Sequence, residues 1–221
     1  MRFLRPIMLA SLFFTMSALI SYAQQDVEDL AKYGSISIIN GLTDLLHPCQ
    51  ILADFQTIYE HKGKLEGLKM SYIGDGNNMA NSLIVGGLKM GMDVTVACPE
   101  GFDPDKRVLK FAEENGHFGL YRDPVEACAG ADVIFTDVWA SMGQEEEAGY
   151  RKQVFGGIYQ INNKTLAAAN PGCMVQHCLP AHRGEEITEE VFEAHADEIF
   201  DEAENRLHAQ KAVMVALMEK K

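Results

Sequence analysis

Basic residues are scarce in this sequence, and their scarcity argues against two classes of partner. Nineteen lysines and arginines stand against 32 aspartates and glutamates, which gives a formal net charge of −13. Nucleic acids and anionic lipid surfaces both require a basic protein face. The composition therefore argues against a nucleic-acid-binding protein and against an electrostatic membrane anchor. The acidity gives no indication of a substrate, because solvated helix faces account for it.

The sequence also lacks the cysteine patterns of a disulfide framework or a structural metal site. Its five cysteines are an odd number, and no Cys-x-x-Cys pair occurs among them. Disulfide-rich domains carry even sets of cysteines, and structural zinc sites carry closely spaced pairs. We therefore expect free thiols, no bound metal and a reducing, cytoplasmic compartment.

The first 24 residues give a different indication. Arg2 and Arg5 precede a mostly apolar run over residues 7–20, and residues 21–23 (Ser-Tyr-Ala) resemble a cleavage site. This is the pattern of a secretory signal peptide, which makes export an alternative to the cytoplasm. An aberrant start, through truncation, frameshift or a wrong initiator, is the other interpretation. We treat residues 1–24 as a segment apart and residues 25–221 as one domain.

Beyond residue 25, β-branched runs alternate with helical patterns. This alternation predicts an α/β fold with a doubly wound, Rossmann-like parallel sheet flanked by helices. The expected strands are residues 35–39, 68–73, 94–98, 133–136 and 173–176, with an edge strand at 199–200. The expected helices are residues 49–61, 77–90, 103–115, 165–169, 191–194 and 205–219, and residues 143–150 are expected to form a polar loop.

Residues 177–180 (His-Cys-Leu-Pro) directly follow one of these strands. Open α/β sheets bind ligands at the carboxyl ends of their strands, so Cys178 stands where a ligand is expected. A proline ends the strand there, and an X-Pro bond in a tight turn is a candidate for the cis isomer. The alternatives are a buried, inert Cys178 and a core histidine at His177, and two such residues are too few to hold zinc.

Residues 74–78 (Gly-Asp-Gly-Asn-Asn) also follow a strand, and they open a helix. A helix N-terminus is a natural place for a ligand. The third glycine of the dinucleotide fingerprint is replaced by Met79, and no acidic residue ends the next strand, so NAD is not expected. The alternative is a tight turn with asparagines as helix caps.

Asp137 ends a third predicted strand, and Ser141 and Met142 lie on the loop after it. A carboxylate can pair with an ammonium group, while a hydroxyl and loop amides can bind a carboxylate. Together these groups suit the two charges of an α-amino acid. The alternative is an N-cap aspartate followed by an ordinary loop serine.

A last group of candidates lies near two helix starts. His47 and Gln50 are one turn apart, so both can face the same ligand. A histidine before a proline is equally well an ordinary helix start. Arg206 follows acidic residues, and its alternative role is a salt bridge to Glu202 or Glu204.

In their order along the chain, these motifs resemble the second half of the ornithine carbamoyltransferases, within the aspartate/ornithine carbamoyltransferase family. The resemblance runs from about residue 22 to the end, through residues 47–50, 74–78, 137–145, 177–180 and 202–206. It implies transfer of the carbamoyl group of carbamoyl phosphate to L-ornithine, giving citrulline for arginine biosynthesis, without a cofactor. Relatives that use putrescine or acetylornithine, and a non-catalytic amino-acid-binding module, stay as alternatives.

The resemblance also implies individual roles. Cys178 and Asp137 orient the reacting amine, His47 polarises the carbonyl group, and Arg206 contacts carbamoyl phosphate; these four are the expected catalytic residues. The expected substrate-binding residues are His47, Gln50, Asn78, Asp137, Ser141, Met142, Cys178, Leu179 and Arg206.

Two features of the family are not found in these 221 residues. The family holds phosphate in an N-terminal domain with a Ser-Thr-Arg-Thr-Arg loop, which does not occur here, and Ile20 stands where the family has an arginine. We therefore expect this chain alone to form no citrulline above background. The family forms homotrimers largely through that domain, so we expect a monomer or an ill-defined oligomer.

Overall fold

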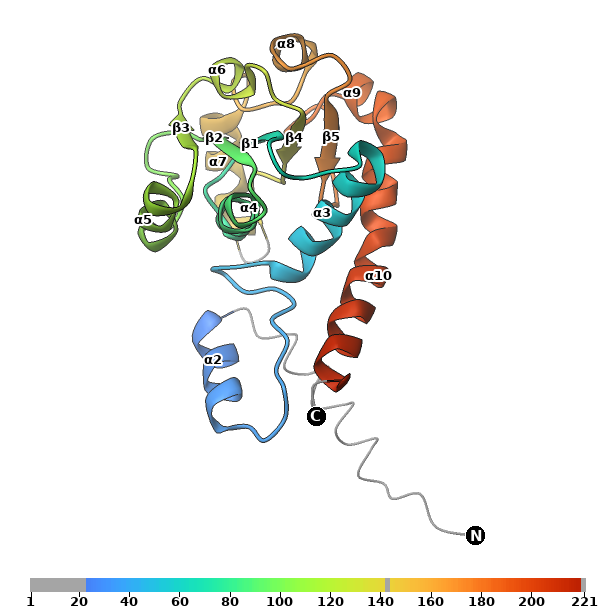
Figure 1. The fold of residues 1–221 in the computed structure, drawn as a ribbon. Coiled ribbons are helices and arrows are strands. Elements are labelled where there is room, and N and C mark those ends of the chain that lie inside the picture. The colour runs from blue at the N-terminus through green and yellow to red at the C-terminus, as the bar shows by residue number, and fades with distance from the viewer. Residues whose placement is uncertain (1–22, 142–143, 220–221) are drawn as a thin grey trace.

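A parallel five-stranded sheet lies at the centre of the described chain. The computed structural model describes residues 23–141 and 144–219. The strands are Lys69–Ile73 (β1), Asp93–Ala97 (β2), Phe118–Tyr121 (β3), Val133–Thr136 (β4) and Met174–His177 (β5). Their order is β3-β2-β1-β4-β5, and every neighbouring pair is parallel (Figure 1). The carboxyl ends of all five strands therefore meet at one edge.

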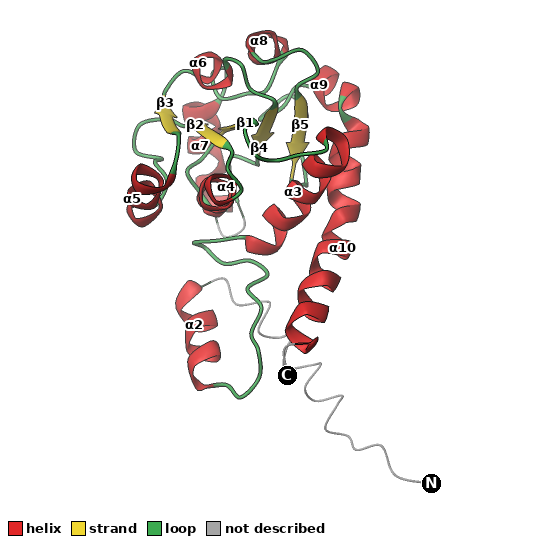
Figure 2. Ribbon diagram, viewed as in Figure 1, coloured by secondary structure: helices red, strands yellow, loops and turns green. Residues whose placement is uncertain are grey.

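Helices cover both faces of this sheet, which confirms the doubly wound fold (Figure 2). In the part of the chain that the structure describes, every helix is too short or too polar to cross a lipid bilayer. The helices are Gln24–Tyr33 (α2), Pro48–Lys62 (α3), Asn78–Lys89 (α4), Lys106–Asn115 (α5), Pro124–Cys128 (α6), Ala148–Phe155 (α7), Asn163–Ala168 (α8), Glu189–Ala194 (α9) and Ala196–Glu219 (α10), with a 3-10 turn at Glu145–Glu147.

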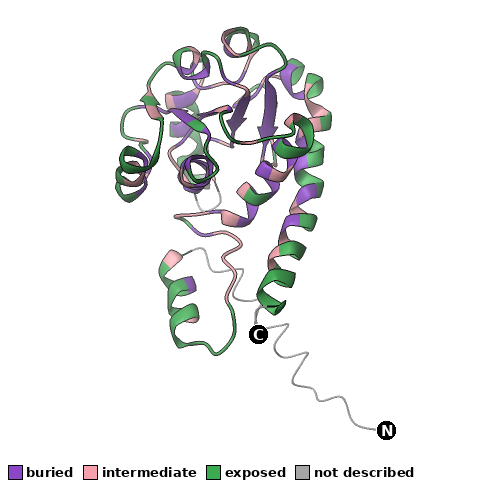
Figure 3. Ribbon diagram, in the orientation of Figure 1, coloured by how far each residue is buried: buried purple, intermediate pink, exposed green. Residues whose placement is uncertain are grey.

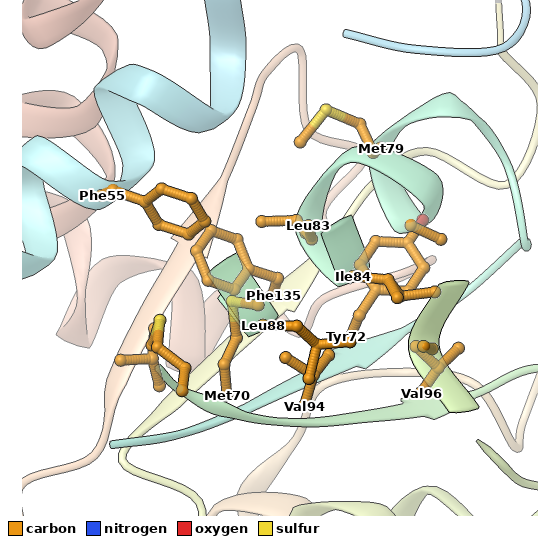
Figure 4. Close-up of a cluster of buried hydrophobic side chains, with 14 of the residues drawn as sticks. Phe55, Met70, Tyr72, Met79, Leu83, Ile84, Leu88, Val94, Val96 and Phe135 are labelled. Carbon is orange, nitrogen blue, oxygen red and sulfur yellow. The ribbon is translucent and has the colours of Figure 1, made fainter. Parts of the chain in front are cut away.

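The strands alternate their side chains between two apolar layers, as strand geometry requires. Met70 and Tyr72 of β1 pack with side chains of α3, α4 and α5 on one face (Figure 4). Ile73, the next residue, packs on the other face with side chains of α6, α7 and α9. β4 and β5 are consequently buried throughout, and β1 and β2 are buried from their second residue on (Figure 3). Burial on both faces explains why residues 133–136 of β4 appear in the sequence as a short, mostly apolar run.

Two of the predicted strands are wrong. Residues 35–39 form no strand; they follow α2 in a segment that lies away from the sheet, so no described strand is beside them to pair with (Figure 1). Residues 199–200 lie in the second turn of α10. Ile199 is fully buried while Phe200 is 55% exposed, and such a change over two residues fits a helix as well as a strand.

Other differences concern short elements. The edge strand β3 was not predicted; it contains Gly119 and an exposed Leu120, so it lacks the apolar run of the inner strands. Helix α5 begins later than predicted, because Asp105 rather than Asp103 caps it by accepting from the backbone N–H of Arg107. The predicted polar loop ends early, since α7 begins at Ala148.

Gly76 allows two backbone segments to approach closely at the carboxyl edge. Its N–H donates to the Phe102 carbonyl at 2.9 Å, and a Cβ at residue 76 would lie 2.3 Å from the Asp103 carbonyl carbon. We expect Gly76→Ala to lower the free energy of unfolding by about 1–3 kcal/mol or more, because backbone atoms cannot move aside cheaply. Urea unfolding followed by circular dichroism measures this change.

Gly149→Ala is the matched control for that substitution. Residue 149 lies in α7, and an added Cβ meets no atom within 4 Å. The control is expected to be neutral or to gain up to about 1 kcal/mol of helix propensity. Equal effects of the two substitutions would contradict the close approach at Gly76.

Candidate functional site

Three strand ends bring one group of predicted residues together at the carboxyl edge of the sheet. Asp137 follows β4 and Cys178 follows β5, and the Cys178 thiol donates to Asp137 Oδ1 at 3.2 Å. Asp137 Oδ2 accepts from Asn77 Nδ2 at 2.8 Å, and the same nitrogen lies 3.3 Å from Ser141 Oγ. Asp137, Ser141 and Cys178 thus share one hydrogen-bond network, as their places after strands predicted.

Asn77 is the centre of this network, although only its neighbour was predicted as a site residue. The side-chain oxygen of Asn77 caps α4 by accepting from the N–H groups of Met79 and Ala80. Asn78 instead donates from Nδ2 to the Thr43 carbonyl at 2.7 Å and is buried. The role of Asn78 as a substrate ligand stays a prediction. The capping position after a strand is the signal that marks Asn77.

The Cys178 side chain is a neutral thiol at ordinary pH. Burial, and then the negative charge of Asp137, raise the pKa of Cys178 well above its usual value. A thiol donates a hydrogen bond, whereas a thiolate beside a carboxylate would be repelled. The geometry therefore suits a hydrogen-bond donor that holds Asp137 in place and does not suit a nucleophilic cysteine.

An open cleft of about 410 Å³ adjoins this network. Its lining includes Asn77 and Ser141 from the network and Arg151 from α7. Arg151 is buried, donates to Asp75 Oδ2 at 2.5 Å and to the Trp139 carbonyl at 3.0 Å. Burial raises the pKa of Asp75, while the Arg151 guanidinium acts against that rise. Sequence reasoning missed Arg151, because nothing near it in the sequence marks a buried ion pair.

A second group of predicted residues lies between α3 and α10. Arg206 of α10 donates to the side-chain oxygen of Gln50 in α3. His47 is the residue before α3; it is 7% exposed, and its backbone N–H donates to Ser82 Oγ at 2.7 Å. The alternative salt bridge of Arg206 to Glu202 or Glu204 is not found among the described residues. Glu202 accepts from Gln50 and from the His177 N–H, and Glu204 lies 3.5 Å from His208.

His47 is a neutral imidazole in this environment. Burial, followed by the positive charge of Arg206, lowers the pKa of His47 to about 4, against a smaller opposing effect of a backbone hydrogen bond at Gly41. Its Nδ1 is buried without a hydrogen-bond partner in the described part of the chain. His47 can therefore offer a neutral ring nitrogen to a ligand, but it brings no positive charge.

The remaining candidates have structural surroundings. His177 is a satisfied core histidine: its Nδ1 accepts from the Leu179 N–H at 2.9 Å, and its Nε2 lies 3.1 Å from Glu186. The predicted cis bond is confirmed at Leu179-Pro180. Met142 lies outside the described residues. Within residues 23–141 and 144–219, no cluster of three or more His, Cys, Asp or Glu side chains is arranged to hold a metal ion.

Comparison with protein families gives two matches. The profile described as "Aspartate/ornithine carbamoyltransferase, Asp/Orn binding domain" matches residues 66–217. The profile described as "Aspartate/ornithine carbamoyltransferase, carbamoyl-P binding domain" matches residues 8–60. The second match begins inside the segment 1–24, and the division at residue 24 stays a prediction.

Individual relatives agree with these matches. An ornithine carbamoyltransferase of Thermococcus kodakarensis is 55% identical over 202 residues, which are 89% of this chain and 64% of that protein. One of Geobacter metallireducens is 53% identical over 200 residues, 90% of this chain and 66% of that protein. The chain therefore spans slightly less than two thirds of the length of these relatives.

Solved structures give the same result. The ornithine carbamoyltransferase structure from Pyrococcus furiosus superposes with a TM-score of 0.85 at 47% identity, covering 100% of this chain and 74% of that one. An anabolic ornithine carbamoyltransferase from Campylobacter jejuni gives a TM-score of 0.86 at 32% identity, covering 94% of this chain and 74% of that one. Sequence and fold together assign this chain to the aspartate/ornithine carbamoyltransferase family.

Proposed function

We propose that this chain binds L-ornithine at the carboxyl edge of the sheet, for transfer of the carbamoyl group of carbamoyl phosphate to the ornithine side-chain amine. The observation that carries the proposal is the network in which the Cys178 thiol and Asn77 orient Asp137 next to Ser141. The names of the relatives, all ornithine carbamoyltransferases, support the same substrates.

The network offers complementary groups to both ends of an amino acid. The Asp137 carboxylate is an acceptor for an amine. The Cys178 thiol that donates to Asp137 is neutral, so Asp137 keeps its full negative charge. The Ser141 hydroxyl is a donor for the α-carboxylate. A positively charged amine gains from a charge-assisted hydrogen bond to Asp137. After losing a proton, the same amine is the nucleophile of the transfer reaction.

The group between α3 and α10 suits the carbamoyl side of the reaction. Arg206 supplies positive charge, Gln50 an amide oxygen and His47 a neutral ring nitrogen. The amine attacks the carbonyl carbon, a proton leaves the nitrogen, and the bond to the phosphate oxygen breaks. Catalysis then consists mainly of holding both substrates close and stabilising the negative charge that develops on the carbonyl oxygen.

Titration with ornithine tests the proposed binding. We expect saturable chemical-shift changes with a dissociation constant of roughly millimolar, because a few charge-assisted hydrogen bonds must offset the entropy lost on association. Putrescine, which lacks the carboxylate, and acetylornithine, which lacks the free α-amine, are expected to bind more weakly. Absence of any saturable change in a folded sample would refute the proposal. Stronger binding of either analogue would change the assigned substrate.

A citrulline assay on the same samples tests the expectation that these 221 residues alone are inactive. Both substrates are supplied, and Cys178→Ala and Arg206→Ala serve as controls. Citrulline formed by the unaltered chain and abolished in both controls would contradict the expected inactivity. It would at the same time support the transferase assignment. The expected monomer or ill-defined oligomer, in place of the homotrimer of the family, stays a prediction, which the mass of the particle in solution tests.

A further inference from the structure

Two carboxyl groups lie buried against each other between α3 and α10. Asp54 and Glu202 are both 0% exposed. Nε2 of Gln50 donates to Asp54 Oδ1 and to Glu202 Oε1, both at 2.8 Å. The two carboxyl groups also lie within hydrogen-bonding reach of each other once one of them carries a proton. Figures 1 and 2 show the two helices side by side at this end of the sheet.

A buried carboxyl pair of this kind is stable only if it holds a proton, since two adjacent charges in a dry site repel each other. Burial raises the pKa of both carboxyl groups, that of Asp54 to about 7 and that of Glu202 well above its usual value. Arg206 is the charged group of α10 that acts against the rise at Asp54. From β5, His177 contributes its backbone N–H, and the Cys178 side chain is neutral.

Hydrogen-bond accounting places the proton on Asp54. Glu202 accepts two N–H groups, from Gln50 through Oε1 and from His177 through Oε2 at 2.9 Å. Asp54 Oδ2, by contrast, has no donor among the described residues. Two N–H donors favour the charged form of Glu202. A proton on Asp54 Oδ2, donated to Glu202, gives every oxygen of the pair a partner.

The pair also determines the orientation of the Gln50 amide. Carboxyl oxygens of the pair face its Nε2, while the Arg206 guanidinium faces its Oε1. A guanidinium can only donate hydrogen bonds, so the reversed amide would set donors against donors. Only one orientation of the Gln50 amide therefore satisfies the hydrogen bonds of Gln50, Asp54, Glu202 and Arg206 together.

We propose that Asp54 and Glu202 share one proton and are positioning residues that hold the Gln50 carbonyl oxygen toward Arg206. This inference rests on the function proposed above, in which the carbamoyl group binds beside Arg206. A carbamoyl NH2 group is a hydrogen-bond donor, so it requires an acceptor such as the Gln50 oxygen. An acetyl group in the same place offers no donor, and sites built for a hydrogen bond reject analogues that lack it.

Asp54→Asn tests the shared proton, because asparagine reproduces the protonated residue: Nδ2 can donate to Glu202, and Oδ1 can accept from Gln50. Burial raises the pKa of Asp54 from its usual value of 3.8 to about 7, so between these two pH values the wild type takes up a proton at Asp54 when it folds. The folding equilibrium constant should therefore fall by up to about tenfold per pH unit as the pH rises through that interval. Asp54→Asn should lose this part of the pH dependence of the folding equilibrium constant, which urea unfolding at pH 5, 6 and 7 measures.

The difference in stability between variant and wild type cancels the contributions of the other titrating groups to the pH dependence. His47, whose pKa is lowered by burial, acts in the opposite direction between about pH 4 and its usual value of 6.5. Asp197→Asn, at an exposed position in the first turn of α10, is the matched control and should keep the wild-type pH dependence. An unchanged pH dependence in Asp54→Asn would overturn the shared proton.

The side-chain amide signals of Gln50 in NMR spectra test the orientation. Two Nε2 proton signals that exchange slowly with water, at chemical shifts distinct from those of a solvated glutamine, are expected in the wild type and in Asp54→Asn. Asp54→Leu, which has neither donor nor acceptor, should move both signals toward the shifts of a solvated glutamine and speed their exchange with water. Unchanged signals in a folded Asp54→Leu protein would overturn the positioning role, and if that variant does not fold, loss of the two signals in Asp54→Asn would overturn it.

These measurements need no ligand. If the pH dependence of stability differs between wild type and Asp54→Asn but ornithine does not bind, only the proposed function is refuted. If ornithine binds and the two pH dependences are the same, only the shared proton is refuted.

Discussion

Replacing Asp137 with asparagine is expected to weaken ornithine binding about ten- to a hundredfold, which corresponds to roughly 1.5–3 kcal/mol for a hydrogen bond to a charged group. The substitution keeps the size of the side chain and removes its charge. It also places an NH2 group opposite Asn77 Nδ2 or the Cys178 thiol, which are donors to the carboxylate in the wild type. Calorimetric titration measures the affinity, and circular dichroism establishes that the variant is folded.

Asp44→Asn separates a specific contact from the general charge of the cleft. Asp44 lines the same cleft and is exposed, and the Gln24 backbone N–H donates to it at 2.7 Å. Among the described residues it makes no hydrogen bond to the Asp137 network, so the loss of its charge should change the affinity less than about threefold. Equal weakening in the two variants would mean that the summed negative charge attracts the amine, and that Asp137 has no special role.

Arg151→Met is expected to lower the free energy of unfolding by about 3–5 kcal/mol at neutral to alkaline pH. The substitution leaves Asp75 buried without its ion-pair partner, which lies 2.5 Å away in the wild type. The pKa of Asp75 is already raised by burial, and it should rise further when the guanidinium is lost. Asp75 can then take up a proton, so the destabilisation should shrink as the pH falls. Urea unfolding of the variant and of the wild type at pH 5 and pH 8 measures the destabilisation at each pH.

Arg183→Met is the control for that ion pair. Arg183 lies 2.6 Å from Glu193, but their side chains are 45% and 55% exposed. Exposed pairs contribute at most about 1 kcal/mol, so the control should lose no more than that. Adding Asp75→Asn to Arg151→Met should recover part of the lost stability. A small, pH-independent loss in Arg151→Met would show that the buried pair is not what stabilises this part of the site.

The sheet could be predicted from the sequence because its inner strands are buried on both faces. Residues 133–136 form a short apolar run between turn residues, and the structure has a strand there. β3 has no such run, since it is an edge strand with a glycine inside it. Tertiary contacts also override local preference at Ile199, where a helix packs a β-branched residue against the sheet.

The predicted residues of the carboxyl edge were found for a local reason: each one follows a strand, and parallel strands end at the same edge. Arg151, Asp54 and Glu202 have no such local signal. Arg151 meets a partner 76 positions away, and Glu202 meets Gln50 across 152 positions. Nothing in the neighbouring residues identifies partners at such distances. Asn77 and Asn78 could not be told apart, because either asparagine can cap a helix.

The contact of α10 with α3 has a consequence for synthesis of the chain. Gln50 and Glu202 are separated by 152 residues, and a ribosome needs roughly 8–30 s to add that many. Asn77, Asp137 and Cys178 have all been made before α10 begins. In a growing chain the network of Asn77, Asp137 and Cys178 can therefore form first. Gln50 stays solvated and without a fixed orientation until the last helix docks against α3.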